Sequence, residues 1–416
     1  MKALGVIGLV GIACARIAFG ADDFLEQVDD ALALSIFRDE VRARLSGTLD
    51  LEGYDFQRPA SGLIYAEGGR LFNPRLALFL DAQVGPRIYL FVQSRLDRGF
   101  DPSAEGAQAR LDEYAVRITP WDDGRLNLQI GKFATVVGNW VPRHRSWDNP
   151  FVTAPLPYEN FTGIFDTAAA RSVDSLLRWA HVGPAGSPEG ENADSLLRVP
   201  VIWGPSYTSG ASLTGVLGRF DCSVEWKNAA LSSRPEVWDA AETQWQHPTF
   251  SGRLGYRPNE MWNLGFSASA GSYLRPSALP TLAPGFGLDD YREVVLGQDL
   301  SFAWHHVQLW AECYEARFAI PLVGGVETLA YYVEAKYKFT PQFFGALRWN
   351  QQQFSRVRAG DGSLVPWGNE VWRLDVAPTY RFTPYIECKL QCSLQHNAAG
   401  RPVYSRLLAA QFVVRF

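Results

Sequence analysis

The chain has 416 residues, of which 47% are apolar, 13% are aromatic and only 20% are charged. This composition is too apolar for a disordered protein, and the length fits either two or three ordinary domains or one large β-barrel. The formal net charge is −5, from 39 basic and 44 acidic residues without a block of like charge. Because binding to a phosphate backbone needs a basic surface, the composition argues against nucleic acid as a partner.

Residues 1–20 have the pattern of a secretory signal peptide. Lys2 precedes an apolar run from Leu4 to Phe19, and small residues lie just before Ala21. The run is shorter than the roughly 20 apolar residues that a membrane-spanning helix needs. We therefore expect cleavage of this segment and export across the inner membrane.

Residues 21–40 are predicted to form a short amphipathic helix. Apolar residues recur in this segment at helical spacing, at Phe24, Leu25, Val28, Leu32 and Ile36. We interpret the helix as a periplasmic lead-in to the first strand. The alternatives are an oligomerisation helix or a plug.

From Val41 to the C-terminus, apolar residues recur at every second position, which is the period of a β-strand. In residues 41–52, apolar side chains alternate with Arg, Ser, Thr, Asp and Glu. The same alternation returns in residues 328–339, 372–382, 386–394 and 408–416. Each strand is therefore predicted to have one apolar and one polar face, as in either a soluble sandwich or a membrane barrel.

The connections between these segments favour the barrel. Long connections are predicted at 55–70, 98–109, 134–199, 229–249, 273–291, 318–326, 355–368 and 397–403, and each is followed or preceded by a short one. This alternation is typical of an up-and-down antiparallel membrane barrel with short periplasmic turns and long extracellular loops. The count predicts an all-β transmembrane barrel over residues 41–416 with about sixteen strands, or eighteen if the longest loop contains two more.

Several segments resemble those of Gram-negative outer-membrane porins. Tyr337 to Pro341 and Tyr380 to Pro384 each place aromatic residues before a Thr-Pro turn, where a barrel has its aromatic girdle. The chain ends on Phe416, similar to the terminal residue by which porins are recognised for barrel assembly. Residues 128–133, followed by Val137 and Gly138, resemble more weakly the strand before the third loop of phosphate-selective-type porins.

The resemblance to porins implies an outer-membrane location, contact with membrane lipid and a homotrimer as the expected assembly. It also implies that the third extracellular loop, at about residues 134–199, folds into the lumen and narrows it over residues 137–166. No arginine ladder can be matched residue by residue, so phosphate selectivity is not implied.

Charged and aromatic side chains in this loop are the candidate constriction. Arg143 and Arg145 opposite three carboxylates would set a transverse field, and the aromatic rings would stack on sugar rings. In the alternative interpretation, the aromatic residues only pack the loop against the inner wall. The predicted constriction and pore-lining residues are Trp140, Arg143, Arg145, Trp147, Asp148, Tyr158, Glu159 and Asp166 in the loop, and Arg95, Arg117, Arg348 and Arg373 in the wall.

No sequence pattern indicates catalysis, a metal site or a cofactor. Cys222, Cys313, Cys388 and Cys392 all fall on apolar strand faces, where they are expected to be free thiols. The six histidines form no zinc-binding or hydrolase motif. We therefore expect a protein that is not an enzyme and binds no cofactor or metal.

The sequence predicts a porin that lets small hydrophilic solutes or ions diffuse passively through a polar lumen. One alternative is a plugged, substrate-specific channel. Another is a non-transporting surface or structural barrel, similar to an adhesin, with a lumen closed by salt bridges.

Overall fold

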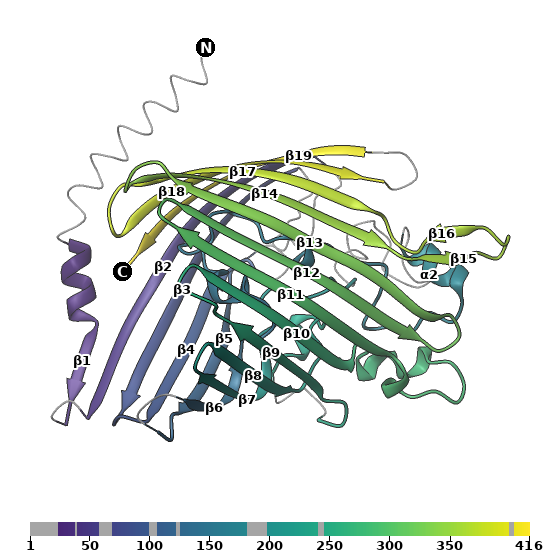
Figure 1. Ribbon diagram of the computed structural model, residues 1–416, viewed down its shortest axis with the longest axis horizontal. Coiled ribbons are helices and arrows are strands. Elements are labelled where there is room, and N and C mark those ends of the chain that lie inside the picture. Colours follow the sequence, from purple (N-terminus) through teal and green to yellow (C-terminus); the bar gives the residue numbers. More distant parts are fainter. Residues whose placement is uncertain are drawn as a thin grey trace, which may run out of the picture.

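The computed structural model describes residues 24–37, 40–57, 69–99, 106–121, 125–180, 198–239, 245–398 and 403–416. Within them, sixteen antiparallel strands pair in chain order, and the last pairs with the first to close a barrel (Figure 1). The strands are β2 (Val41–Phe56), β3 (Arg70–Val84), β4 (Ile88–Asp97), β5 (Gln108–Ile118), β6 (Leu126–Phe133), β7 (Thr208–Leu217), β8 (Phe220–Lys227), β9 (Thr249–Tyr256), β10 (Trp262–Ser272), β11 (Arg292–Trp304), β12 (Val307–Ile320), β13 (Gly324–Lys338), β14 (Phe343–Phe354), β17 (Val371–Arg381), β18 (Ile386–Asn397) and β19 (Val403–Arg415). The predicted sixteen-stranded barrel is confirmed, whereas the predicted signal peptide lies outside the described residues.

The two faces of the strands differ as their alternation predicts. In β2, the side chains of Leu49 and Leu51 are exposed on the outside of the barrel, whereas Asp50 and Glu52 are buried on the inside. Exposed leucine, valine and aromatic side chains continue around the outer surface. An apolar outer band of this kind is typical of a barrel that stands in a membrane.

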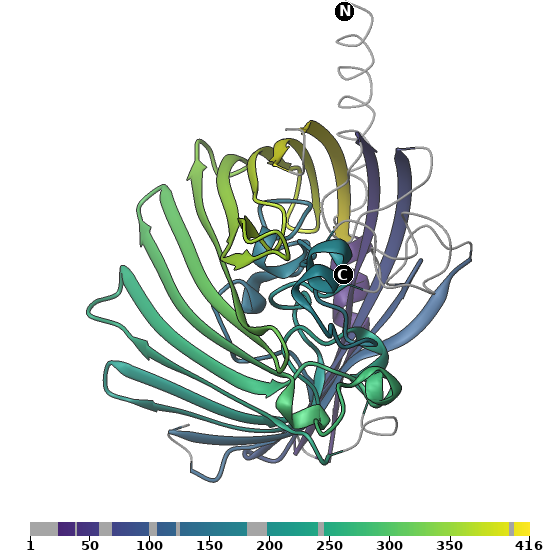
Figure 2. The same ribbon diagram turned by 90° about the vertical axis from the view of Figure 1, so that its right-hand side faces the viewer.

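The two ends of the barrel differ in their connections. At one end, which we call the turn end, the predicted Thr-Pro turns join β13 to β14 through residues 339–342 and β17 to β18 through residues 382–385. The opposite end, the loop end, carries the longest connection, residues 134–207, which we call loop 3. Figure 2 shows the described parts of this segment, residues 134–180 and 198–207, inside the ring of strands.

Several short helices and a two-stranded hairpin lie at the loop end. Loop 3 contains η1 (Val141–Arg143), η2 (Leu156–Tyr158) and α2 (Val173–Trp179). The connections after β8 and β10 contain η3 (Pro235–Val237), η4 (Pro276–Thr281) and η5 (Leu288–Asp290), and β15 (Arg356–Arg358) pairs with β16 (Leu364–Pro366) in a hairpin after β14. Among the described residues, no helix has the length and apolar character that crossing a membrane requires.

The predicted long connection at 318–326 is wrong, because β12 and β13 are joined by residues 321–323 alone. Near the loop end the polarity of these strands is reversed. Phe318 and Val326 point inward and are buried, whereas Arg317 and Glu327 point outward, with 61% and 47% of their side chains exposed. At this end, the outer face of the strands carries polar side chains and the inner face contacts a packed interior. The expected pattern, apolar outside and polar inside, therefore ends before the strands do.

That packed interior is the largest apolar cluster of the described residues. It joins inward side chains of β11 to β13, such as Tyr314 and Phe318, to loop 3 side chains, such as Ile164 and Leu176. The part of the lumen beside β11 to β13 at the loop end is therefore a dry core.

The predicted helix over residues 21–40 is observed over residues 24–31, and it is followed by a strand that the periodicity did not predict, β1 (Ala33–Ile36). β19 ends beside Gly47, so the edge of β2 nearer the turn end has no partner from β19. β1 pairs with that edge over residues 41–44. Leu25 packs against Ile386 at the turn end, so the described part of this segment does not form a plug.

Candidate functional site

Loop 3 enters the barrel after β6, and side chains of the wall hold its backbone at successive residues. These wall groups are carboxylates and side-chain amides that accept hydrogen bonds from loop N–H groups. The bonds run from Ala134 to Glu113 (2.8 Å), from Val136 to Glu225 (3.1 Å), from Trp140 to Glu312 (2.8 Å), from Val152 to Gln391 (2.7 Å) and from Leu156 to Asn350 (3.2 Å). A loop inside a barrel needs such partners, because a buried backbone group without a hydrogen bond is costly.

Basic side chains of the wall bind the loop carbonyls in the same way. Lys389 donates to the carbonyl of Asn149 (2.7 Å), Arg348 to that of Thr153 (3.0 Å) and Arg373 to that of Ala154 (2.6 Å). Both arginines also pair with Asp375, and Arg373 pairs with Glu159 of the loop. Arg348 and Arg373, which we predicted to line the pore, are at most 1% exposed and instead hold loop 3 against the wall.

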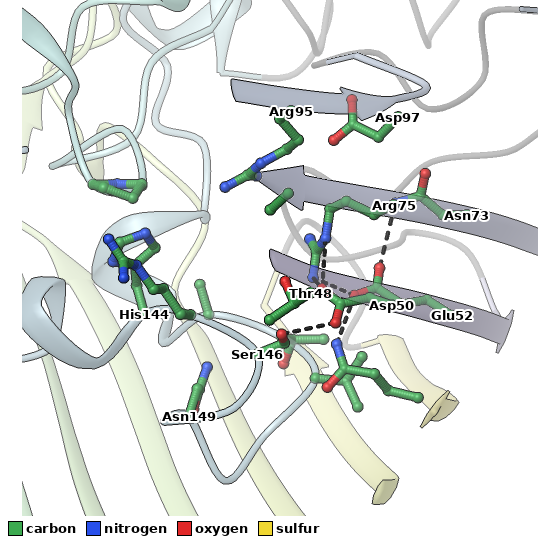
Figure 3. Close-up of a pocket in the computed structure, with 18 of the residues that line it drawn as sticks. Thr48, Asp50, Glu52, Asn73, Arg75, Arg95, Asp97, His144, Ser146 and Asn149 are labelled. Carbon is green, nitrogen blue, oxygen red and sulfur yellow. Dashed lines mark hydrogen bonds and ion pairs between the residues drawn. The ribbon is translucent and has the colours of Figure 1, made fainter. Parts of the chain in front are cut away.

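A cavity of about 220 Å³ remains between loop 3 and the wall formed by β2 to β5 (Figure 3). Ser146 of loop 3 crosses to this wall and donates a hydrogen bond to Asp50 (2.8 Å). The charged lining residues are Asp50, Glu52, Arg75, Arg95, Asp97, Arg110, Arg145 and Glu159, and the aromatic ones are Tyr54, Phe79, Trp140, His144, Phe151, Trp203, Tyr207 and Trp238.

The wall arginines stand in front of their carboxylate partners. Arg75 pairs with Asp50 (3.0 Å) and Glu52 (2.5 Å), as Figure 3 shows. In the same way Arg95 pairs with Asp112 (2.9 Å), and Arg110 pairs with Asp112 (2.8 Å) and Asp97. These carboxylate side chains are at most 4% exposed, whereas the three arginine side chains are 16–22% exposed. A solute in the cavity therefore meets guanidinium donors before it meets carboxylates.

Arg145 of loop 3 is the least neutralised cation of the cavity. Its side chain is 44% exposed, and the one carboxylate within 4.0 Å among the described residues is Glu113, at 3.9 Å. The guanidinium carbon lies 4.3 Å from the centre of the Phe79 ring, a cation–π contact across the cavity edge. Arg145 thus presents charge and hydrogen-bond donors to the cavity.

His144, next to Arg145, makes two short polar contacts through its ring nitrogens. Its Nδ1 lies 2.5 Å from the carbonyl of Val141, and its Nε2 lies 2.5 Å from the hydroxyl of Tyr207. A carbonyl can only accept, so Nδ1 carries a proton. Burial lowers the pKa of His144 to about 3, which agrees with an uncharged ring.

Four of the twelve predicted site residues line the cavity, namely Trp140, Arg145, Glu159 and Arg95. Besides Arg348 and Arg373, six others lie elsewhere. Two of them form ion pairs: Arg143 with Glu334 (2.5 Å), and Asp166 with Arg234 (3.0 Å) and Arg275 (2.6 Å). Two form hydrogen bonds: Tyr158 donates to Glu312 (2.7 Å), and Arg117 donates to Gln129 (2.9 Å). The Trp147 ring contacts the guanidinium groups of Arg381 (4.5 Å) and Arg415 (4.1 Å), and Asp148 is exposed.

The charges that we expected to oppose one another across a single gap are therefore not brought together. Arg143 faces β13, Arg145 faces the cavity, and Asp166 is fully buried between two arginines from other loops. The physical reason is that each buried charge takes the nearest opposite charge, and those partners lie in segments far away in the sequence.

Sequence reasoning missed several cavity residues, among them Asp50, Glu52, Arg75 and Asp97, although their alternation places them inside. Choosing them from the many inward charges requires the strand register. Asp112 carries no such signal, because a register shift opposite Gln93 turns both Asp112 and its neighbour Glu113 inward. No group of three or more His, Cys, Asp or Glu side chains that could hold a metal ion occurs among the described residues.

No protein-family model matches the sequence, and no curated protein matches it. Solved structures do match. The anion-selective porin of Comamonas acidovorans is 11% identical, with a TM-score of 0.54 over 91% of this chain and 100% of that one. The outer-membrane channel DcaP of Acinetobacter baumannii is 11% identical (TM-score 0.53; 92% and 100%), and the trimer form of the outer-membrane protein OmpT of Vibrio cholerae is 8% identical (TM-score 0.51; 91% and 100%). The chain therefore has the barrel fold of outer-membrane porins.

Proposed function

We propose that this protein is an outer-membrane porin through which small hydrophilic solutes diffuse passively. The observation that carries the proposal is the cavity between loop 3 and β2 to β5, lined by paired charges inside a barrel with an apolar outer surface. Charges in this number must be hydrated, because dry burial is too costly. Residues 1–20 would direct export, and the apolar band would contact lipid.

The proposed route lies to one side of the barrel axis. The dry core fills the lumen beside β11 to β13 at the loop end, so solutes would pass beside β2 to β5. At the turn end lies a second hollow, of about 1120 Å³, lined by Arg257, Asn263, Gln308 and Trp310 among others. Selectivity would then depend on the width and the charges of the narrow part, beside Arg145.

We also propose a weak preference for anions, since Arg145 and the wall arginines are more exposed than their carboxylate partners. The trimer form of a structural neighbour supports a homotrimer as the assembly to test.

Planar-bilayer recording of the purified protein tests the proposal. We expect stepwise conductance in salt solution. If no conductance appears at any applied potential, the porin proposal is wrong and a closed structural barrel is favoured.

The variant Arg145→Ala tests the proposed route. Removing one charge at about 4 Å in water should cost an anion about 1 kcal/mol of attraction, so anion permeability should fall about fivefold and the anion-to-cation permeability ratio by at least that factor. Arg358→Ala is the control, because Arg358 is exposed on the β15–β16 hairpin outside the barrel wall. An unchanged ratio in Arg145→Ala would place the conducting route elsewhere.

A further inference from the structure

We infer that the cavity beside loop 3 binds small solutes that join a carboxylate to a single aromatic ring. The inference deepens the proposed function, since it names the class of solute that the proposed route would retain. It depends on three features of the cavity: a fixed and accessible cation, rigid aromatic walls and a small volume.

The cation is Arg145, and the structure fixes it before any solute arrives. Its carbonyl accepts hydrogen bonds from the N–H groups of Asp148 (3.0 Å) and Asn149 (2.9 Å), and the next residue, Ser146, is bonded to Asp50 of the wall (2.8 Å). Phe79 supports the guanidinium from the barrel side. A carboxylate can accept two parallel hydrogen bonds from a guanidinium. Because the backbone and the ring already hold Arg145, little entropy is lost on binding.

The other walls of the cavity are aromatic and rigid. On the side of loop 3, the rings of Tyr207 and Trp238 pack edge to face with centroids 5.8 Å apart, and Trp140 packs against Tyr158 at 4.4 Å. All of these side chains are at least nine-tenths buried, so they form a rigid backing, and the aromatic surface open to a solute is mainly that of the partly exposed Phe79 and His144. Water held against such walls makes few hydrogen bonds, so an apolar ring that displaces it gains free energy.

The carboxylates of the cavity do not oppose a bound anion strongly. Asp50, Glu52 and Asp97 lie behind the guanidinium groups with which they pair, and they expose almost no surface. Repulsion from them is therefore offset by the arginines that lie nearer to the solute. The site consequently favours an anion by direct contact with Arg145 rather than by a strong overall potential.

The volume limits the size of the solute. A cavity of about 220 Å³ holds roughly seven water molecules at about 30 Å³ each. That is below the 300–1,000 Å³ typical of pockets for drug-sized ligands. One ring with its acid group fits this range, whereas a larger polycyclic acid does not.

Two measurements test the inference with benzoate as the probe. Isothermal titration of the detergent-solubilised protein should give saturable binding of benzoate at least about tenfold tighter than that of acetate, since only benzoate buries a ring. Benzyl alcohol, which has the ring without the charge, should bind more weakly than benzoate. In planar bilayers, benzoate should reduce the potassium chloride conductance over the same concentration range.

Three variants assign the binding to the cavity. Arg145→Ala should abolish benzoate binding, and Arg145→Lys should weaken it because an ammonium group lacks the planar pair of donors. Phe79→Leu should reduce the advantage of benzoate over acetate. Arg358→Ala should bind like the natural protein.

The outcomes separate this inference from the proposed function. Equal binding of benzoate and acetate, or unchanged benzoate binding in Arg145→Ala, overturns the inference even if the protein conducts. Absence of conductance in salt solution without benzoate overturns the porin proposal. The titration still decides whether the cavity binds aromatic carboxylates.

Discussion

Gly138 controls where loop 3 approaches the barrel wall. Its φ is +79°, a backbone conformation that favours glycine. A Cβ atom at this position would collide with the hydroxyls of Tyr314 and Tyr158 and would lie 2.7 Å from the carboxylate of Glu312. Those three groups are hydrogen-bonded to one another, with Tyr158 2.7 Å from Glu312 and 2.8 Å from Tyr314. Any side chain at residue 138 must therefore displace this network.

At the residue scale, we predict that Gly138→Ala lowers the free energy of unfolding by about 3 kcal/mol, through backbone strain and this collision. Gly204→Ala is the matched control. Gly204 also has a positive φ, of +49°, but a Cβ there meets nothing within 4 Å, so only the strain of about 1 kcal/mol applies. Denaturant unfolding in detergent measures both values. Equal losses in the two variants would show that the contacts around residue 138 do not matter.

At the scale of elements, the closure of the barrel depends on the junction of β2 and β19. The backbones of Gly47 and Phe416 exchange two hydrogen bonds, of 2.8 and 3.0 Å. The ring of Phe416 covers Gly47, and a Cβ on Gly47 would lie 2.9 Å from the carbonyl oxygen of Ala77 on β3. The pairing of β19 with β2 therefore requires that residue 47 have no side chain.

Gly47→Val should therefore destabilise the folded barrel by about 1–3 kcal/mol, the usual cost of overpacking. Gly53→Val, in the same strand and on the same face, should stay within about 0.5 kcal/mol of the natural protein, because a Cβ at Gly53 has nothing within 4 Å. The temperature at which the barrel loses its compact mobility on a denaturing gel compares the two. A lower temperature for Gly53→Val than for Gly47→Val would contradict the role of the junction.

The barrel as a whole is divided between a dry part and a wet part. Inward side chains of β11 to β13 pack on loop 3 at the loop end, while the arginines and carboxylates of β2 to β5 face a cavity. Loop 3 is thus both a structural core and one wall of the proposed route. Its stability and the width of the route should change together.

On this whole-molecule scale, Phe318→Ala should cost about 3–5 kcal/mol of unfolding free energy, because it leaves a void in a packed interior. Phe318 is fully buried inside the barrel and contacts Tyr273 (5.4 Å between ring centres). Phe266→Ala is the control on the outer surface, where Phe266 is about half exposed and lipid can fill the space. Similar losses for the two variants in denaturant unfolding would mean that the interior is not a dry core.

The sequence by itself determined the strands and their two faces. Leu49 and Asp50 are neighbours that need opposite surroundings, so alternation at this spacing predicts both the strand and the side on which each residue lies. The same reasoning ended the strands too early and predicted a long connection from Phe318 to Val326, where the inside of the barrel is apolar. Alternation reports the polarity of the surroundings, and it identifies the inside of the barrel only where the inside is wet.

Only the tertiary structure decided which charges form the site. Arg143 and Arg145 are two residues apart in one loop, and nothing in the sequence distinguishes them. Arg143 meets Glu334 of β13 at 2.5 Å and is neutralised, whereas among the described residues Arg145 has a single carboxylate partner, Glu113 at 3.9 Å, and stays open to the cavity. The reason is physical: local pattern sets the preference of a side chain for water or lipid, but the effect of a charge depends on its nearest partners, and folding brings those from distant segments.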